Sequence, residues 1–238
     1  MVAAIAATTS IATAVQYTFQ GETGGVSIQL QTPNSSGTVA LGQFHLTTSD
    51  AGWNSDLYTY CTDVGVTLAT THAYTPFSIP PSQLGVSPSW VSGGIEKAAA
   101  LYYYNNSLAT AGSQKAGLQL AIWEALYSTK SSYTKNDFFS SLNPTFHILA
   151  PDSGTVDTVA TYAAQILNAV LGLSSADILT ADQNTLWLAP VDRQGHISGS
   201  QGLLYPGNTT VPEADSTLTL LGVAITAIGV AGRRMRRS

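Results

Sequence analysis

Charged residues are scarce in this chain of 238 residues, at 10% of the total against about a quarter in an average soluble domain. Ser, Thr, Gly, Asn and Gln fill the gap, which is typical of β-rich extracellular proteins rather than of cytosolic enzymes. Four of the nine basic residues lie in the last six positions, and residues 15–212 carry a formal charge of −7. Without a basic patch to neutralise phosphates, nucleic acid is not an expected partner.

Cysteine is almost absent, because Cys61 is the only one. This excludes an intramolecular disulfide and every C-x-x-C metal or redox motif. A lone thiol in an exported protein is prone to oxidation or to pairing with another chain. We therefore expect the fold either to bury Cys61 or to use it.

Common catalytic and metal-binding motifs are also missing. The sequence has no G-x-S-x-G elbow, no P-loop and no G-x-G-x-x-G after a strand. The histidines lack zinc-site spacing and the aspartates lack calcium-loop spacing, so neither a metal nor a cofactor is expected. No enzyme activity is expected either, although a hydrolase with two carboxylates far apart in the chain stays open. The histidines are His45, His72, His147 and His196.

The first 14 residues are apolar or small and end in Ala12-Thr-Ala14. This pattern is typical of a signal peptide with a cleavage site, so the mature chain is expected to begin at Val15. The alternative is a buried N-terminal helix, but the segment has no polar face.

Three features follow one another in residues 211–238. Val211-Pro212-Glu213 comes first, residues 216–232 are uncharged, and a basic cluster closes the chain. As a helix the uncharged stretch would span about 25 Å, close to the ~30 Å hydrocarbon core of a bilayer. A basic end fixes that side in the cytoplasm. The alternative is an amphipathic soluble helix, which would need a polar stripe that is absent. The basic residues are Arg233, Arg234, Arg236 and Arg237.

This tail resembles the PEP-CTERM sorting signal of Gram-negative bacteria, which has a Val-Pro-Glu-Pro-type motif, a membrane span and a basic end. Ala214 stands where the family usually has its second proline. The resemblance implies processing by an exosortase-type transpeptidase, an intermediate anchored in the inner membrane, and a final place in the cell envelope, at the surface or in the extracellular matrix.

Residues 15–195 are expected to form one α+β domain, with a β-rich sandwich or barrel-like part and a helical insertion; a Gly/Ser/Asn-rich linker over 196–210 and a C-terminal transmembrane helix follow. Alternating apolar and polar residues predict the early strands, separated by turn signals. A Pro-rich loop is expected to start near Pro76. The predicted strands are residues 17–20, 26–31 and 39–46, a further strand or pair of strands in 57–68, and a closing strand at 185–189.

Apolar residues at helical spacing predict about three helices, over residues 95–104, 114–128 and 155–171. The second of these is apolar nearly all round. Such a helix belongs in the middle of a fold.

Two segments point to a site: Tyr58-Thr-Tyr60-Cys61-Thr-Asp63 on a predicted strand and Leu118-Gln119-Leu-Ala121-Ile122-Trp123 on the second helix. Together they resemble the bacterial thioester domain of surface adhesins, which has an aromatic-Cys motif and a later Gln-x-Ala-(aliphatic)-Trp motif. Leu118 replaces the Thr that commonly precedes the glutamine. The resemblance covers about residues 44–127.

The resemblance implies an internal thioester between Cys61 and Gln119, supported by Tyr60, Asp63, Ala121 and Trp123. The stored acyl group would be transferred once, to an amine on a partner surface. The alternative is a non-covalent structural or exopolysaccharide-associated protein, in which Cys61 is an ordinary buried thiol and Gln119 caps a neighbouring strand. The two residues are far apart in the chain, so only the fold can bring them together.

Overall fold

The computed structural model describes about two thirds of the chain. Residues 1–13 of the predicted signal peptide and the predicted tail at 211–238 lie outside the described residues, so the predictions for them, including the transmembrane helix, stay predictions. The described ranges are 14–32, 36–50, 53–64, 71–78, 90–143, 146–149, 154–191 and 202–207.

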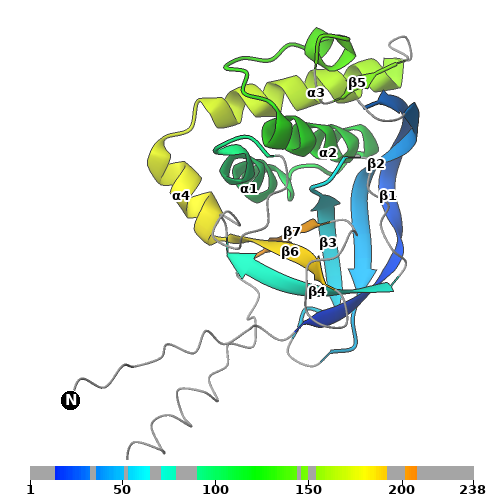
Figure 1. Cartoon of the computed structure of the whole chain (residues 1–238), viewed down its shortest axis with the longest axis vertical. Helices are drawn as coiled ribbons and strands as arrows, with labels where there is room; N and C mark the ends of the chain where they lie inside the picture. Colours follow the sequence, from blue (N-terminus) through cyan, green and yellow to red (C-terminus); the bar gives the residue numbers. More distant parts are fainter. Residues whose placement is uncertain are drawn as a thin grey trace, which may run out of the picture.

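Seven antiparallel strands and four α-helices make up the described fold, which confirms the α+β class. Figure 1 shows the strands gathered on one side of the molecule and the helices on the other. The strands are β1 (Val15–Gln31), β2 (Ser36–Thr47), β3 (Asp56–Cys61), β4 (Thr71–Ser78), β5 (His147–Ile148), β6 (Thr185–Val191) and β7 (Leu203–Pro206).

The strand pairings close a ring. β1 pairs with both β2 and β4, and the order continues from β2 through β3, β7 and β6 back to β4. Six strands therefore form a barrel, and β5 adds two residues to the end of β1. Irregular register between Phe19 and Gly21 and between Thr23 and Val26 bends β1, as bulges do where a sheet closes on itself. This bending lets one long strand pair with two neighbours.

The helices form an insertion between β4 and β6. α1 follows Gly93, whose φ of 74° is in the left-handed region that glycine tolerates best. α4 begins at a capping box in which Ser174 Oγ accepts from Asp177 N. The helices are α1 (Gly94–Asn105), α2 (Gly112–Tyr127), α3 (Gly154–Leu171) and α4 (Ser175–Gln183), and a 3-10 turn, η2 (Lys135–Phe139), lies between α2 and α3.

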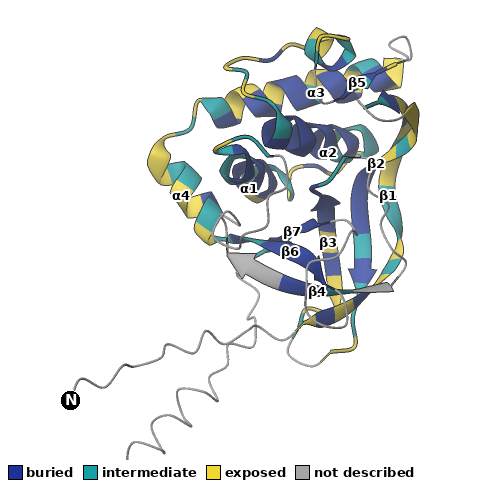
Figure 2. Cartoon of the chain, in the orientation of Figure 1, coloured by how far each residue is buried: buried dark blue, intermediate teal, exposed yellow. Residues whose placement is uncertain are grey.

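α2 is the central helix, as predicted. It contacts α1 and α3 on one side and β1, β2 and β3 on the other, and Figure 2 shows it buried along most of its length. Residues 116–126 are all buried. Because both sides of the helix are covered, any polar side chain on it must find a partner inside the protein.

The predicted helices at 95–104, 114–128 and 155–171 are confirmed, and α4 is an addition. Two strand predictions need correction. The three early predicted strands are two, because β1 continues through the Gly24-Gly25 turn signal as a bulge. The expected Pro-rich loop is β4 up to Ser78. Among the described strands, this end of β4 pairs with β6 alone, and a strand edge without a ladder partner tolerates a proline such as Pro76.

The stretch expected to be a linker also contributes to the fold. Residues 203–206 form β7 between β3 and β6 and complete the barrel. In the described part of the chain no single helix is long and apolar enough to cross a membrane, while α3 and α4 together, across a bend of 110°, meet that test by length and composition.

The packing of α4 on α1 makes stability depend on pH. Burial and the neighbouring Glu96 raise the pKa of Asp182 to about 6. The folded state therefore binds the carboxyl proton of Asp182 more tightly than the unfolded state does. The contribution of protonated Asp182 to the free energy of unfolding is complete below the pKa of an aspartate in the unfolded chain, near 4. It is lost as the pH rises through about 6. We expect Asp182→Asn to raise the melting temperature more at about pH 7.5 than at about pH 5. Equal shifts at the two pH values would contradict this.

Candidate functional site

Cys61 ends β3 on the inner face of the barrel. Alternate residues of a strand share a face, and Tyr58, on the opposite face, is 43% exposed whereas Leu57, Thr59 and Cys61 are at most 1% exposed. On one side Cys61 faces Leu203 of β7. The thiol is therefore enclosed, as expected for a single cysteine.

Gln119 is a fully buried glutamine in the middle of α2. Its carboxamide contacts the main chain of Cys61 at both polar groups. The backbone N–H of Cys61 donates to Gln119 Oε1 at 2.8 Å, and Gln119 Nε2 donates to the backbone oxygen of Cys61, also at 2.8 Å. The fold thus brings together the two residues that the sequence motifs single out.

The carboxamide takes the place of a missing strand partner. The ladder between β2 and β3 ends at the pair Phe44 and Thr59. Continued by two residues, its register would place Gly42 opposite Cys61. Gln119 occupies the gap and accepts and donates as a strand backbone would. The helix therefore holds the amide carbon of Gln119 beside the cysteine.

The pair is sealed from solvent. Both residues are 0% exposed, and neither of the two open pockets described, of about 360 and 180 Å³, is lined by either residue. Bulk water therefore does not touch either residue. A partner molecule would reach the pair only after local opening of the barrel end.

The surroundings of the thiol keep it protonated. Burial raises the pKa of Cys61 well above its usual value, and the nearby Asp63 and Glu22 carboxylates raise it further. A thiolate is the nucleophilic form of cysteine. Any reaction of Cys61 therefore needs a group that takes up its proton.

Asp63 fixes the chain just after Cys61. Its Oδ2 accepts from the backbone N–H of Gly202 at 2.7 Å and from Thr62 Oγ1 at 3.1 Å, and Thr62 N donates to the oxygen of Gly202 at 2.9 Å. Trp187 Nε1 adds a 3.3 Å hydrogen bond to Thr62 Oγ1. Asp63 thus ties the end of β3 to the start of β7, and burial raises its pKa.

The other three predicted site residues pack around the pair rather than bonding to it through their side chains. Tyr60 is on the opposite face of β3 from the thiol and packs edge-on against Tyr102 of α1, with ring centroids 6.2 Å apart. Trp123, one helical turn after Gln119, packs edge-on against Phe146 at 6.3 Å. Ala121 is fully buried in α2. These side chains support the two elements that carry the pair.

No protein-family model, curated protein or solved structure matches this chain. Function therefore has to be argued from the site itself. Within the described residues there is no group of three or more His, Cys, Asp or Glu side chains that could hold a metal ion.

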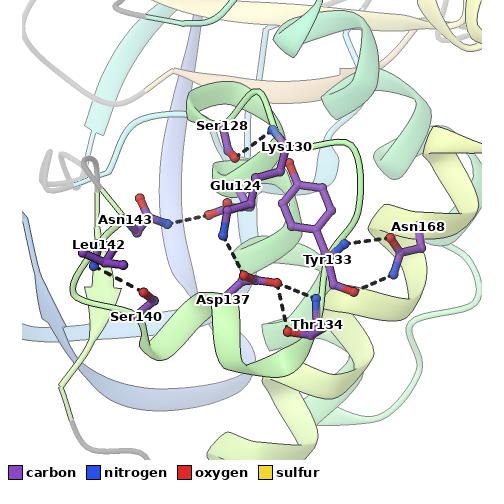
Figure 3. A network of polar contacts seen from close by, with 10 residues as sticks. All are labelled: Glu124, Ser128, Lys130, Tyr133, Thr134, Asp137, Ser140, Leu142, Asn143 and Asn168. Atoms are coloured by element: carbon purple, nitrogen blue, oxygen red, sulfur yellow. Dashed lines mark hydrogen bonds and ion pairs between the residues drawn. The ribbon is translucent and has the colours of Figure 1, made fainter.

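A second carboxamide in the protein makes the same pair of bonds. Asn168 of α3 accepts from the backbone N–H of Tyr133 at 2.9 Å and donates to its oxygen at 2.7 Å (Figure 3). Asn168 is exposed and no cysteine is involved. The two-bond pattern alone therefore does not require chemistry.

The network in Figure 3 anchors the chain that follows α2. Glu124, buried on α2, accepts from Asn143 Nδ2 at 3.1 Å, and Lys130 forms a 2.7 Å ion pair with Asp137. Burial raises the pKa of Glu124. These contacts hold α2 from its outer side, and so help to fix Gln119 on its inner side.

Sequence reasoning missed two residues near the pair. Gly202 lay in the expected linker, and Glu22 lay next to an expected turn. Their proximity to Cys61 depends on strand register, which no local motif reveals.

Proposed function

We propose that Cys61 and Gln119 form an internal thioester, and that the protein is an exported surface adhesin or matrix-associated module that attaches covalently to an amine on a partner. One observation carries this proposal: a buried carboxamide is held by two 2.8 Å hydrogen bonds against the only cysteine of the chain. Reactive groups held together react far faster than the same groups free in solution.

The formation step balances without any outside reagent. Cys61 Sγ attacks the side-chain carbonyl carbon of Gln119, the Sγ–Cδ bond forms, and the Cδ–Nε2 bond breaks. The thiol proton leaves with the nitrogen as ammonia. In the transfer step a primary amine attacks the same carbon, an amide forms, and the thiol is restored.

Formation of the thioester would change the hydrogen bonds at the end of β3. Thioester formation removes Nε2 and so leaves the buried backbone oxygen of Cys61 without its donor, at a cost of about 1–3 kcal/mol. Neither product restores this donor without cost. A carboxylate from hydrolysis cannot donate when ionised, and the N–H of a trans secondary amide points away from the side on which its oxygen accepts.

The cellular location that we propose for the protein is inferred from the sequence alone. Residues 1–14 would direct export, and residues 211–238 would serve as a sorting and membrane-anchoring tail for an exosortase-type enzyme. The partner amine would belong to a protein at the cell surface or in an exopolysaccharide matrix. The low charge of the chain suits such a location.

Intact-mass spectrometry of the full chain tests the bond. The wild type is expected about 17 Da below its unmodified mass, because ammonia is lost. Cys61→Ala should have its full mass, and Gln119→Glu should show no loss of ammonia. Methylamine should add to the wild type and release a thiol that alkylating reagents label after denaturation.

A wild type at full mass with a free thiol would rule the thioester out. The second candidate would then stand: a non-covalent structural or exopolysaccharide-associated surface protein. The bonds between Asn168 and Tyr133 favour it, because they show the same pattern in a purely structural role.

A further inference from the structure

Glu22 of β1 shares the inner face of the barrel with Cys61. Glu22 faces Phe44 across the β1–β2 ladder, and Phe44 faces Thr59 across the β2–β3 ladder. Residues directly opposite in an antiparallel pair point to the same face, and Cys61 is two residues beyond Thr59 on the same strand. The side chain of Glu22 therefore points toward the part of the barrel that holds the thiol.

Two glycines make room for the Glu22 carboxyl group. A Cβ on Gly42 would overlap it, and a Cβ on Gly25 would lie 2.6 Å from its Oε1 and 2.8 Å from its Oε2. Gly42 is the residue that the ladder register would place opposite Cys61, where the Gln119 carboxamide now lies. The Glu22 carboxyl group therefore lies against Gly42, the residue of β2 nearest in register to the Cys61–Gln119 pair.

One oxygen of Glu22 has nothing to bind. Oε1 is inaccessible to solvent and has no hydrogen-bond partner among the described residues. Burial raises the pKa of Glu22, and its charge in turn raises that of Cys61. Asp63, the other nearby acid, already uses Oδ2 to accept from Gly202 and Thr62. A buried acceptor without a donor lowers the stability of the fold, so its presence calls for an explanation such as a functional role.

Resting on the proposed thioester, we propose that Glu22 is the proton-transfer group of the Cys61–Gln119 site. During formation its carboxylate takes the proton from Cys61 Sγ as the sulfur attacks Cδ of Gln119. It then gives this proton to Nε2 as the Cδ–Nε2 bond breaks and ammonia leaves. Glu22 ends as it began, and no other reagent is consumed.

The same group serves the transfer step in the opposite direction. An incoming primary amine has to lose a proton when it attacks the thioester carbon, and the departing Cys61 sulfur has to gain one. Glu22 accepts the proton from the amine and supplies a proton to the Cys61 sulfur. These are the proton transfers of ammonia release in the reverse direction. Glu22 is half-buried, so part of its side chain is exposed to solvent. Its negative charge there favours an approaching ammonium group, such as a lysine side chain.

Among the residues that the structure describes, few other charged or titratable groups lie around Glu22. Lys115 of α2 lies nearby, with its Nζ 3.3 Å from Thr23 Oγ1. Cys61 and Asp63 lie on and just beyond β3. Neither Lys115 nor Asp63 replaces Glu22, because Lys115 bonds the neighbouring threonine and Asp63 holds the β7 junction.

Glu22→Gln in the full chain tests the inference, because it keeps the shape and removes the proton acceptor. Thioester occupancy and the rate of methylamine addition are measured by intact mass over a range of pH, with rates expressed per free amine. In the wild type this rate should rise with pH as Glu22 ionises and then level off. In Glu22→Gln it should be roughly 100-fold lower and independent of pH, or the thioester should fail to form.

Glu96→Gln is the matched control, because Glu96 also has a buried oxygen that finds no hydrogen-bond partner in the described part of the chain, but it lies on α1. It should match the wild type in thioester occupancy and in the rate and pH profile of methylamine addition. If Glu22→Gln does not fold by circular dichroism, Glu22→Asp decides, with a slower rate and a shifted pH profile expected. A variant that forms the bond and reacts with the wild-type rate and pH profile overturns the role of Glu22 and leaves the thioester intact. A wild type at full mass overturns both.

Discussion

Replacing Gln119 by Leu in a Cys61→Ala background is expected to lower the free energy of unfolding by about 2–6 kcal/mol, because two buried backbone groups each lose a partner worth about 1–3 kcal/mol. The groups are the N–H and C=O of residue 61, which the carboxamide now satisfies. Leucine has a similar size but no polar atoms. Urea unfolding followed by circular dichroism measures the change.

The Cys61→Ala background matters because a thioester would itself link two residues 58 positions apart in the chain. Such a link restricts the unfolded state and stabilises the fold independently of the hydrogen bonds. Asn168→Ala is the control with the same bond pattern. Asn168 is exposed, so water can replace its bonds to Tyr133, and a loss of only about 0.5–1.5 kcal/mol is expected. Equal losses in the two variants would mean that burial of the Gln119 pair adds nothing.

Gly202→Ala is expected to destabilise the fold by about 1–3 kcal/mol and to reduce thioester occupancy. A Cβ on Gly202 would lie 2.7 Å from Thr62 Oγ1 and would also overlap the indole nitrogen of Trp187. Either β7 must shift or the bonds among Gly202, Thr62 and Asp63 must lengthen. Since these bonds hold the end of β3, the sulfur of Cys61 would move relative to Gln119.

Denaturant unfolding and intact mass measured on the same samples connect the two effects. Gly172→Ala is the matched control, because a Cβ there meets only ordinary contacts, the nearest being the oxygen of Ala169 at 3.5 Å. It should retain wild-type stability and occupancy. If Gly202→Ala lost stability but kept full occupancy, the β7 junction would not position the thiol.

The helical part of the fold was accessible from the sequence, because α2 and α3 have long apolar patterns at helical spacing. α4 was not, because only Ala181 among its residues is buried. Strand limits were harder to predict. Gly24-Gly25 reads locally as a turn, and only the pairing of β1 with β2 on both sides of it identifies a bulge. β7 has four residues and is a strand because β3 and β6 bind it from both sides.

The candidate site was predictable as far as its motifs extend. Cys61 and Gln119 each lie in a recognisable segment, and their contact follows from a strand end meeting a central helix. Glu22 lies in no motif. It comes close to Cys61 only through the successive registers of two ladders and two glycines that clear its path. Such cross-strand relations are tertiary and leave no signal in a single sequence.

The pairing of Cys61 with β7 bears on when the proposed thioester could form. Residues 203 and 204, which pair with Cys61 and Tyr60, are synthesised long after the cysteine and the glutamine. A chain that is still on the ribosome or only partly translocated contains Cys61 and Gln119. It still lacks β7, the strand that closes the barrel beside Cys61. We therefore expect the proposed thioester to form only after β7 has docked beside Cys61.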